Sequence, residues 1–246
     1  QAYYSLNNGP ARNPIGAPVA AANGTIAWDI DNNTQVSNNA LVRVEDVSNP
    51  TVVYDHSNAT FDIVGTFDIL HPESGDIVIA EDPYNITWNK AGIGVNNVIL
   101  EYSTDQGSNW TYVVSTGNNS VPNTGSYYWA SVPGAALSSY CKIRMHDINN
   151  AYANDTGAGY FDLRGDLSVT RPAGGESWNL ATTENITWAK KGNIATVDVS
   201  YSANNGTNWT TLITGVTASN LTWPWGISNV TQLTTQGKIK VADSSN

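Results

Sequence analysis

Side chains that can perform acid–base or nucleophilic chemistry are few in this sequence, and they are scattered. The histidines are His56, His71 and His146, and no motif repeats around any of them. The sequence contains neither a nucleophile elbow nor a His-Glu-x-x-His run. Neighbouring carboxylates, which glycoside hydrolysis requires, occur at Glu45/Asp46, Glu81/Asp82 and Glu101/Asp105. Because none of these pairs belongs to a recurring motif, we predict that the chain is not an enzyme.

Two acidic stretches are candidates for a calcium site. Residues 29–33 (Asp-Ile-Asp-Asn-Asn) and 147–150 (Asp-Ile-Asn-Asn) place side-chain oxygens at alternate positions, as hard cations prefer. Neither stretch continues into the glycine and glutamate of an EF-hand loop. An Asx-rich turn accounts for both stretches without a metal. We therefore predict no metal site and no cofactor, with Ca²⁺ binding as the alternative.

The composition is typical of a polar surface protein. Of 246 residues, 40% are hydrophobic but only 13% are charged, and the net charge is −10 with 11 Lys+Arg. Nucleic acid is not an expected partner, because there is no basic stripe to neutralise phosphates. No apolar run approaches the length of about 18 residues that a membrane span needs. The single cysteine, Cys141, cannot form a disulfide within the chain and is expected to be a small buried residue.

The clearest local pattern is a short stretch at residues 102–110 that returns at residues 201–209. A worn copy at residues 4–9 has no tryptophan after it. In each stretch a strand ends at Tyr-Ser, and Asp or Asn with Gly supply a turn that tolerates positive φ. The motif positions are Ser103, Asp105, Gly107, Trp110, Ser202, Asn204, Gly206 and Trp209. The pattern predicts a β-hairpin whose tryptophan packs back under the turn.

This hairpin resembles the Asp-box motif, Ser-x-Asp-x-Gly-x-Thr-Trp, of sialidase propellers and of other β folds. Asn109 and Asn208 stand at the threonine position, and Asn204 stands at the aspartate position. The resemblance implies a structural hairpin. It leaves a sialidase-like glycoside hydrolase as a weak alternative, because the arginines are scattered over the repeats: Arg12, Arg43, Arg144, Arg164 and Arg171.

Self-comparison gives a repeat of about one hundred residues. Residues 85–88 (Asn-Ile-Thr-Trp) recur at 185–188, and residues 142–144 (Lys-Ile-Arg) recur as Lys-Ile-Lys at 238–240. This is the length of an immunoglobulin-like sandwich and about twice that of a propeller blade. Apolar and polar residues alternate over residues 197–201, as in a half-buried strand. We predict an all-β fold of tandem immunoglobulin-like β-sandwich domains.

The repeat divides the chain into three units. Residues 1–65 are expected to be the second half of a repeat, residues 66–165 a complete repeat, and residues 166–246 a repeat without its last strand. At each junction two strand-like runs are separated by only one or two residues around Gly65 or Gly165. So short a link cannot act as a flexible spacer, and we expect a stiff rod. The incomplete end units suggest either a window on a longer array or strands supplied by neighbouring subunits.

The acceptor sequence for N-glycosylation, Asn-x-Ser/Thr, occurs about twice as often as chance pairing would give. The acceptors are Asn23, Asn32, Asn58, Asn85, Asn109, Asn118, Asn154, Asn185, Asn205, Asn208, Asn220 and Asn229. In a strand, burial of Trp188 would turn Asn185 outward, where a glycan fits. We predict covalent N-glycans and an extracellular or cell-surface location, with a merely Asn/Thr-rich composition as the alternative.

Tryptophan is frequent, with nine residues. Those that recur by repeat are expected to pack in cores: Trp88, Trp188, Trp110, Trp209, Trp129 and Trp223. Trp28 is expected to match Trp129. Trp225, beside Pro224 and without a repeat partner, is the candidate for an exposed platform on which a sugar could stack.

The order of these motifs resembles a family. Residues 172–178 (Pro-x-Gly-Gly-Glu-x-Trp), the Asn-Ile-Thr-Trp run, the hairpin and Lys-Ile-[Arg/Lys]-x-x-Asp follow one another. This order is similar to the immunoglobulin-like repeats of microbial surface proteins, akin to the fungal KNH-type Ser/Thr-rich wall-protein domain, over most of residues 66–246. The resemblance implies an extracellular, glycosylated, wall-associated or array-forming protein. Residues 76–78 depart from the pattern, so that position is not expected to be a shared site.

We therefore predict a structural subunit of an extracellular filament, sheath, stalk or surface layer. Its expected partners are copies of itself, with strand complementation as one mode of contact. The alternative is a carbohydrate-binding or adhesion module of a larger secreted protein, for which Trp225 would be the binding residue.

Overall fold

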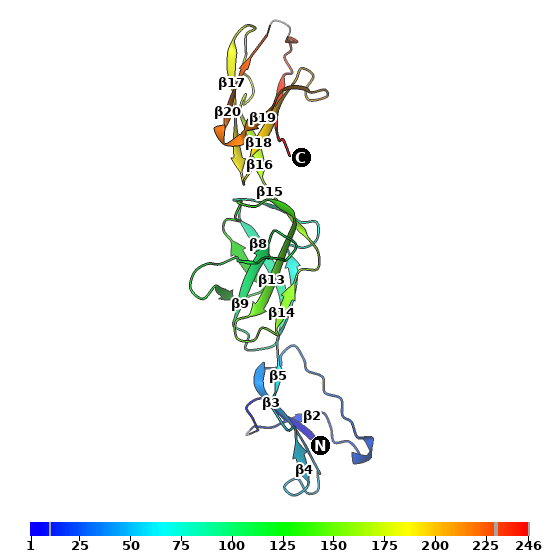
Figure 1. Ribbon diagram of the computed structural model, residues 1–246. Helices are drawn as coiled ribbons and strands as arrows, with labels where there is room; N and C mark the ends of the chain where they lie inside the picture. Colours follow the sequence, from blue (N-terminus) through cyan, green and yellow to red (C-terminus); the bar gives the residue numbers. More distant parts are fainter. Residues whose placement is uncertain (10, 229–230, 246) are drawn as a thin grey trace.

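The chain is built from strands, as the alternating patterns predict. A computed structural model describes residues 1–9, 11–228 and 231–245, which form 21 strands and two short 3₁₀ helices. Figure 1 shows the strands gathered into three bodies that follow one another along an elongated molecule. No helix in the described part of the chain is long and apolar enough to cross a membrane. The all-β prediction is confirmed.

The middle body is a two-sheet sandwich. One sheet has the order β12 (Ser126–Trp129), β8 (Tyr84–Ala91) and β6 (Thr66–His71). The other has β10 (Thr111–Tyr112), β9 (Asn97–Ser103), β13 (Ser138–Asp147), β15 (Phe161–Arg164) and β7 (Ile77–Ile79) in order, with β11 (Ser120–Pro122) and β14 (Asn154–Thr156) at its margins. All pairs are antiparallel except β15 with β7, which is parallel. Two antiparallel sheets of this order make an immunoglobulin-like sandwich.

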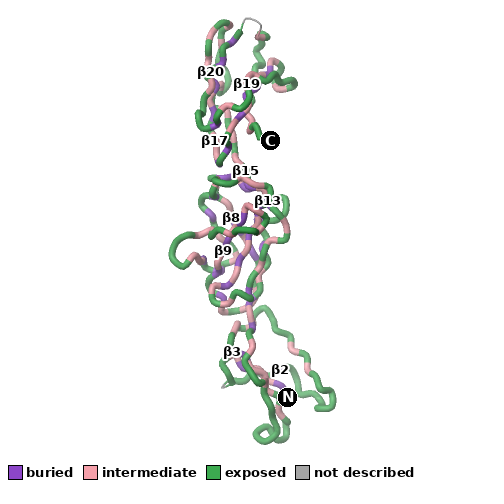
Figure 2. Tube along the Cα trace, in the orientation of Figure 1, coloured by how far each residue is buried: buried purple, intermediate pink, exposed green. Residues whose placement is uncertain are grey.

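The core of this sandwich follows from period-two alternation. Ile86 and Trp88 on β8 face Leu100, Ile143 and neighbouring side chains of the opposite sheet, all of them buried. The buried indole of Trp88 donates a hydrogen bond of 2.9 Å to the side-chain oxygen of Asn123. Cys141 is also buried, as predicted, and burial raises the pKa of its thiol to about 11. Figure 2 shows many of the buried residues in this body.

The third body repeats this design with fewer strands. β16 (Asp166–Arg171), β17 (Thr183–Lys191) and β20 (Thr222–Gly226) form one sheet, and β19 (Thr210–Thr217), β18 (Thr196–Ser202) and β21 (Lys238–Asp243) form the other. The short helix η2 (Ala218–Asn220) lies between β19 and β20. Residues 176–180, which match β7 in sequence, are not a strand. In the middle body β7 is held by β15, and no described residue takes the place of β15 here.

The first body has a single sheet. It consists of β2 (Asn13–Ile15), β1 (Ala2–Ser5), β3 (Ser37–Glu45) and β4 (Tyr54–His56), with β5 (Phe61–Ile63) also on β3 and helix η1 (Ala21–Asn23) in the connection. Its strands match those of one middle-body sheet, so its inner face has no opposing sheet among the described residues. Val44 is 54% exposed, whereas its counterpart Met145 is 1% exposed. Residues 12–22 contain β2 and the start of η1.

Candidate functional site: hairpins, sequons and interdomain junctions

The predicted hairpins form and share one hydrogen-bond pattern. The hydroxyl of Ser103 donates to Asp105 Oδ1 (2.7 Å) and accepts the backbone N–H of Gly107 (2.9 Å). Asp105 Oδ1 also accepts the backbone N–H of Asn109 at 2.8 Å. The second copy repeats these bonds with Ser202, Asn204, Gly206 and Asn208, and the worn copy repeats the serine bonds with Ser5, Asn7 and Gly9. These bonds form a closed local network that satisfies the hydrogen-bonding groups of the turn.

Each complete hairpin is closed by its tryptophan. Gly107 and Gly206 both have φ of +91°, and a Cβ there would lie 3.2–3.3 Å from the ring of Trp110 or Trp209. Glycine is therefore required both by the backbone conformation and by the close approach of the indole. The guanidinium of Arg144 lies 4.3 Å from the Trp110 ring centroid, and the ammonium of Lys240 lies 5.1 Å from that of Trp209. These contacts support a structural hairpin.

The two hairpins differ in one titratable group, which gives a test. Hydrogen bonds from the side chain and backbone of Asn109, and then from the Ser103 hydroxyl, lower the pKa of Asp105 to about 2. The stabilising charge is therefore fully present above the unfolded pKa of about 3.9 and is lost as pH falls through about 2. We expect an NMR titration of the Asp105 carboxyl to show its midpoint at about pH 2. Asn204 cannot titrate, so the second hairpin is the internal control, and a midpoint near pH 4 for Asp105 would contradict the network.

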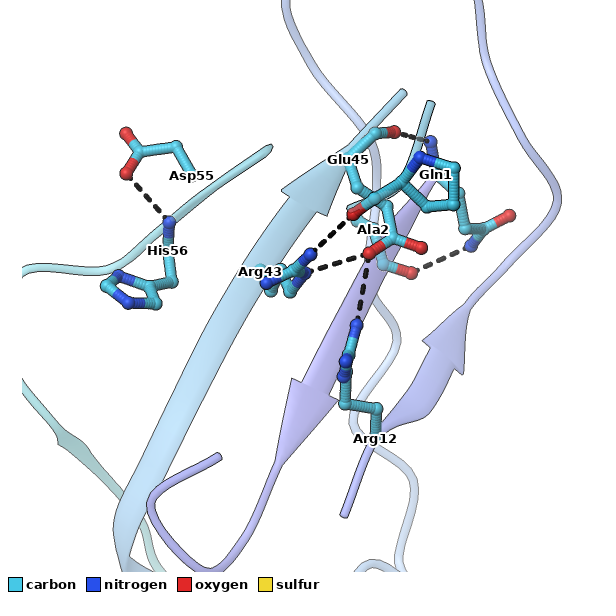
Figure 3. Close-up of polar contacts among 8 residues, drawn as sticks. Gln1, Ala2, Arg12, Arg43, Glu45, Asp55 and His56 are labelled. Atoms are coloured by element: carbon cyan, nitrogen blue, oxygen red, sulfur yellow. Dashed lines mark hydrogen bonds and ion pairs between the residues drawn. The ribbon is translucent and has the colours of Figure 1, made fainter. Parts of the chain in front are cut away.

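Two members of the predicted carboxylate pairs, Glu45 and Glu101, form ion pairs with arginine. Glu45 Oε2 lies 3.1 Å from Arg12 Nη1 and 2.8 Å from Arg43 Nε (Figure 3). Glu101 Oε2 lies 2.6 Å from Arg144 Nε on the corresponding sheet of the middle body. An ion-paired carboxylate is not free to act as a general acid, so these sites support packing of the sheet face. No local pattern marks the pairs of Glu45 with Arg12 and of Glu101 with Arg144, because these partners lie far apart in the sequence.

The acidic stretches behave as Asx turns. Asp31 Oδ1 accepts the backbone N–H of Asn33 at 2.9 Å and the hydroxyl of Thr34 at 3.1 Å. Asp147 Oδ1 accepts the backbone N–H of Asn149 at 3.0 Å. In both stretches one carboxylate oxygen accepts hydrogen bonds from residues of its own turn. These contacts favour the turn interpretation over calcium binding.

The acceptor asparagines lie at the surface. All eleven acceptors in the described part of the chain are exposed, and Asn229 lies outside it. Asn85 and Asn185 occupy equivalent places on β8 and β17, where each alternates with the buried residues Ile86 or Ile186. The expected outward orientation of these asparagines is therefore observed. Their glycosylation remains a prediction.

The structure overturns the interpretation of Trp225. On β17, Glu184 pairs with Trp225, just as Tyr84 on β8 pairs with Trp129. Trp225 is only 8% exposed, and its ring centroid lies 5.1 Å from that of Tyr201. Trp225 is thus the counterpart of Trp129, which was wrongly matched to Trp223.

An exposed sugar platform at Trp225 is therefore excluded. The reason is the strand period, since Trp223 and Trp225 are two residues apart on β20 and both pack against the core of the third body. The Trp-Pro-Trp spacing in the sequence was the signal that could have shown this. Trp28 stacks on Tyr4, with their ring centroids 4.7 Å apart. This position is the one expected if Trp28 is the counterpart of Trp129.

The junction between the middle and third bodies is closely packed. The backbone N–H of Gly192 donates to Glu81 Oε1 at 2.8 Å, and that of Asn193 donates to the carbonyl of Gly134 at 2.8 Å. Lys191 forms an ion pair with Asp82. Leu137 packs against the cores of both bodies. The junction is therefore a joint with polar and apolar contacts on both sides of Gly165.

The junction between the first and middle bodies uses equivalent positions. Val36, the counterpart of Leu137, packs against the middle core, and its N–H donates to the carbonyl of Ile93 at 2.8 Å. Ile93 donates in turn to the carbonyl of Thr34 at 2.9 Å. A Cβ on Gly65 would lie 2.8 Å from Val95, and one on Gly165 would lie 2.7 Å from the carbonyl of Lys191. Both junctions thus insert one aliphatic side chain and use one glycine at the crossing.

Comparisons with known proteins found only weak likenesses to solved structures. No family model matches the sequence, and no curated protein matches it. The fibronectin(III)-like modules of Clostridium thermocellum CbhA align at 15% identity over 65% of this chain and 78% of that chain, with a TM-score of 0.26. A segment of consecutive titin domains aligns at 12% identity over 88% and 70%, with a TM-score of 0.25. Likenesses this weak do not indicate what the chain does.

Proposed function

We propose that the chain is a structural subunit of an extracellular assembly, a filament, sheath, stalk or surface layer built from glycosylated immunoglobulin-like domains. The observation that carries the proposal is the repeated junction, in which Val36 and Leu137 enter the next core at equivalent positions. Binding modules on flexible tethers do not need such joints, whereas a load-bearing rod does. The role is architectural and requires no catalytic centre.

The junctions support stiffness through two kinds of contact. Backbone hydrogen bonds fix the loops of adjacent bodies to one another, and the aliphatic side chain removes apolar surface from water. A link of one residue between β15 and β16 leaves the bodies little conformational freedom to oppose these contacts. Each body therefore fixes the direction of the next.

The partners we propose are further copies of the chain, joined in part by strand addition. One edge of β21 has no strand beside it among the described residues, and the equivalent edge of β13 carries β15. In the segment that matches β7, the indole nitrogen of Trp178 is buried without a hydrogen-bond partner in the described structure. An added strand would pair this edge in the way that β-augmentation completes exposed sheets. The likeness to KNH-type wall-protein domains agrees with this proposal but rests on sequence motifs alone.

Electron microscopy of the natively isolated protein tests the proposal. We expect filaments or a lattice whose axial repeat fits the three bodies, with density for sugars on the exposed acceptor asparagines. The map would also show which chain lies beside β21. Monodisperse particles at every concentration would contradict the assembly and favour an adhesion or carbohydrate-binding module.

A further inference from the structure

A group of metal-ligating side chains lies on the middle body, between the end of β6 and the start of β7. His71, Glu73 and Asp76 place their ligand atoms within 4.8 Å of one another. His71 Nδ1 lies 2.9 Å from Asp76 Oδ2. His71 and Glu73 are exposed, so their side chains can rotate toward a common centre. In the sequence, neither a repeated motif nor a longer metal-binding pattern marks this group.

Asp76 is the fixed member of the group. Its Oδ2 accepts the backbone N–H of Glu73 at 2.9 Å and the hydroxyl of Tyr84 at 3.0 Å. The backbone of Asp76 is held by its own N–H bond to the carbonyl of Glu73 and by the N–H of Asp162, which donates to the carbonyl of Asp76 at 2.8 Å. Outer hydrogen bonds of this kind orient carboxylate ligands in metal sites. One ligand is thus already placed, and two exposed ligands lie beside it.

The fold does not require this set of side chains. In the third body the same turn carries Arg171, Ala173 and Glu176 at the three positions. There Arg171 Nη2 forms an ion pair with Glu184 at 2.7 Å, and Glu176 accepts the backbone N–H groups of residues 173 and 174. An ion pair and a capped turn therefore suffice for the backbone. Among the described residues, the combination of an imidazole with two carboxylates is found only in the middle body.

We propose that His71, Glu73 and Asp76 bind a divalent transition-metal ion of the Zn²⁺ class. One imidazole nitrogen and two carboxylate oxygens are ligands that suit Zn²⁺ and its neighbours, whereas Ca²⁺ takes six to eight oxygens. Ligands at about 2.1 Å from a tetrahedral ion lie about 3.4 Å from one another. The present separations of 2.9 Å and up to 4.8 Å reach that value by side-chain rotation. The fourth position stays open to water or to a donor from a neighbouring molecule.

The test is a titration of the whole chain with ZnCl₂, followed by calorimetry and by the NMR signals of the histidine rings. The titration is run at about pH 8, above the unperturbed imidazole pKa of about 6.5, because the hydrogen bond with Asp76 raises the pKa of His71. We expect the His71 ring to shift while the His56 and His146 rings do not. His71→Gln should weaken binding at least tenfold, by analogy with the loss of supporting groups in metal sites. CaCl₂ at the same concentration should give no comparable shift.

Matched variants keep the result decisive. His56→Gln removes another exposed histidine and should leave the affinity for Zn²⁺ unchanged. Tyr84→Phe keeps the ring but removes the hydroxyl that orients Asp76, and it should weaken binding by a smaller factor than His71→Gln. Equal affinity in the chain with His71→Gln would overturn the proposal, because binding would then be spread over surface carboxylates. An equal response to CaCl₂ would overturn it as well.

Discussion

Replacing Gly165 by valine is expected to open the joint between the middle and third bodies. A Cβ at this position would lie 2.7 Å from the carbonyl oxygen of Lys191 and 2.8 Å from Cδ1 of Ile194. The backbone oxygen cannot rotate away, so the loop of residues 191–194 must shift. Overpacking of this kind lowers the free energy of unfolding by about 1–3 kcal/mol. Small-angle X-ray scattering should show a broader distribution of interbody distances, and the ion pair of Lys191 with Asp82 should weaken.

The matched control is Gly226→Val. Gly226 lies in β20, no atom comes within 4 Å of a Cβ built there, and its φ is not in the left-handed region. This variant should keep the scattering profile of the parent chain. If both variants gave the same profile as the parent, the crossing at Gly165 would not be a packed joint, and the proposal of a stiff rod would lose its main support.

Trp225→Ala is expected to unfold most of the third body. The side chain is buried against Tyr201 and Trp178, with centroid distances of 5.1 and 6.1 Å. Truncating a buried tryptophan to alanine costs about 3–5 kcal/mol, which is a large part of the stability of a small domain. Hydrogen exchange should accelerate across β17 and β18, while the middle body keeps its protection.

The comparison variant is Trp209→Ala, because Trp209 is 37% exposed and lies on the hairpin surface. Trp209→Ala should lower the free energy of unfolding of the third body clearly less than Trp225→Ala does. A Trp225→Ala protein that folded normally and only failed to bind a glycan would restore the carbohydrate-binding interpretation. The pair of variants therefore separates a core residue from a ligand platform.

Much of the fold was predictable because it is encoded in local patterns. The hairpin at residues 201–209 has the expected turn, and the alternation in residues 197–201 gives the buried valines of β18. The outward placement of Asn185 also follows from the strand period alone. Such features depend on neighbours within a few residues, which a sequence displays directly.

The features that were missed depend on residues far apart in the chain. Glu81 meets Gly192 across 111 positions, and Glu101 meets Arg144 across 43 positions. No local pattern indicates such partners. The correspondence of Trp225 with Trp129 was missed for another reason. The two repeats differ in the length of the segment that precedes the strand carrying this tryptophan. Strand register, which fixes the match, is a property of the assembled sheet.

The parallel contact between β7 and β15 has a mechanical consequence. The chain enters the middle body just before β6 and leaves it at the end of β15, so tension applied to the two ends pulls β7 and β15 in opposite directions along their length. Asp162, Leu163 and Arg164 pair with residues 77–79, and these positions must be sheared together rather than peeled apart one by one. The described residues of the third body hold no such pair. Under load, the middle body should therefore resist longer than the third body.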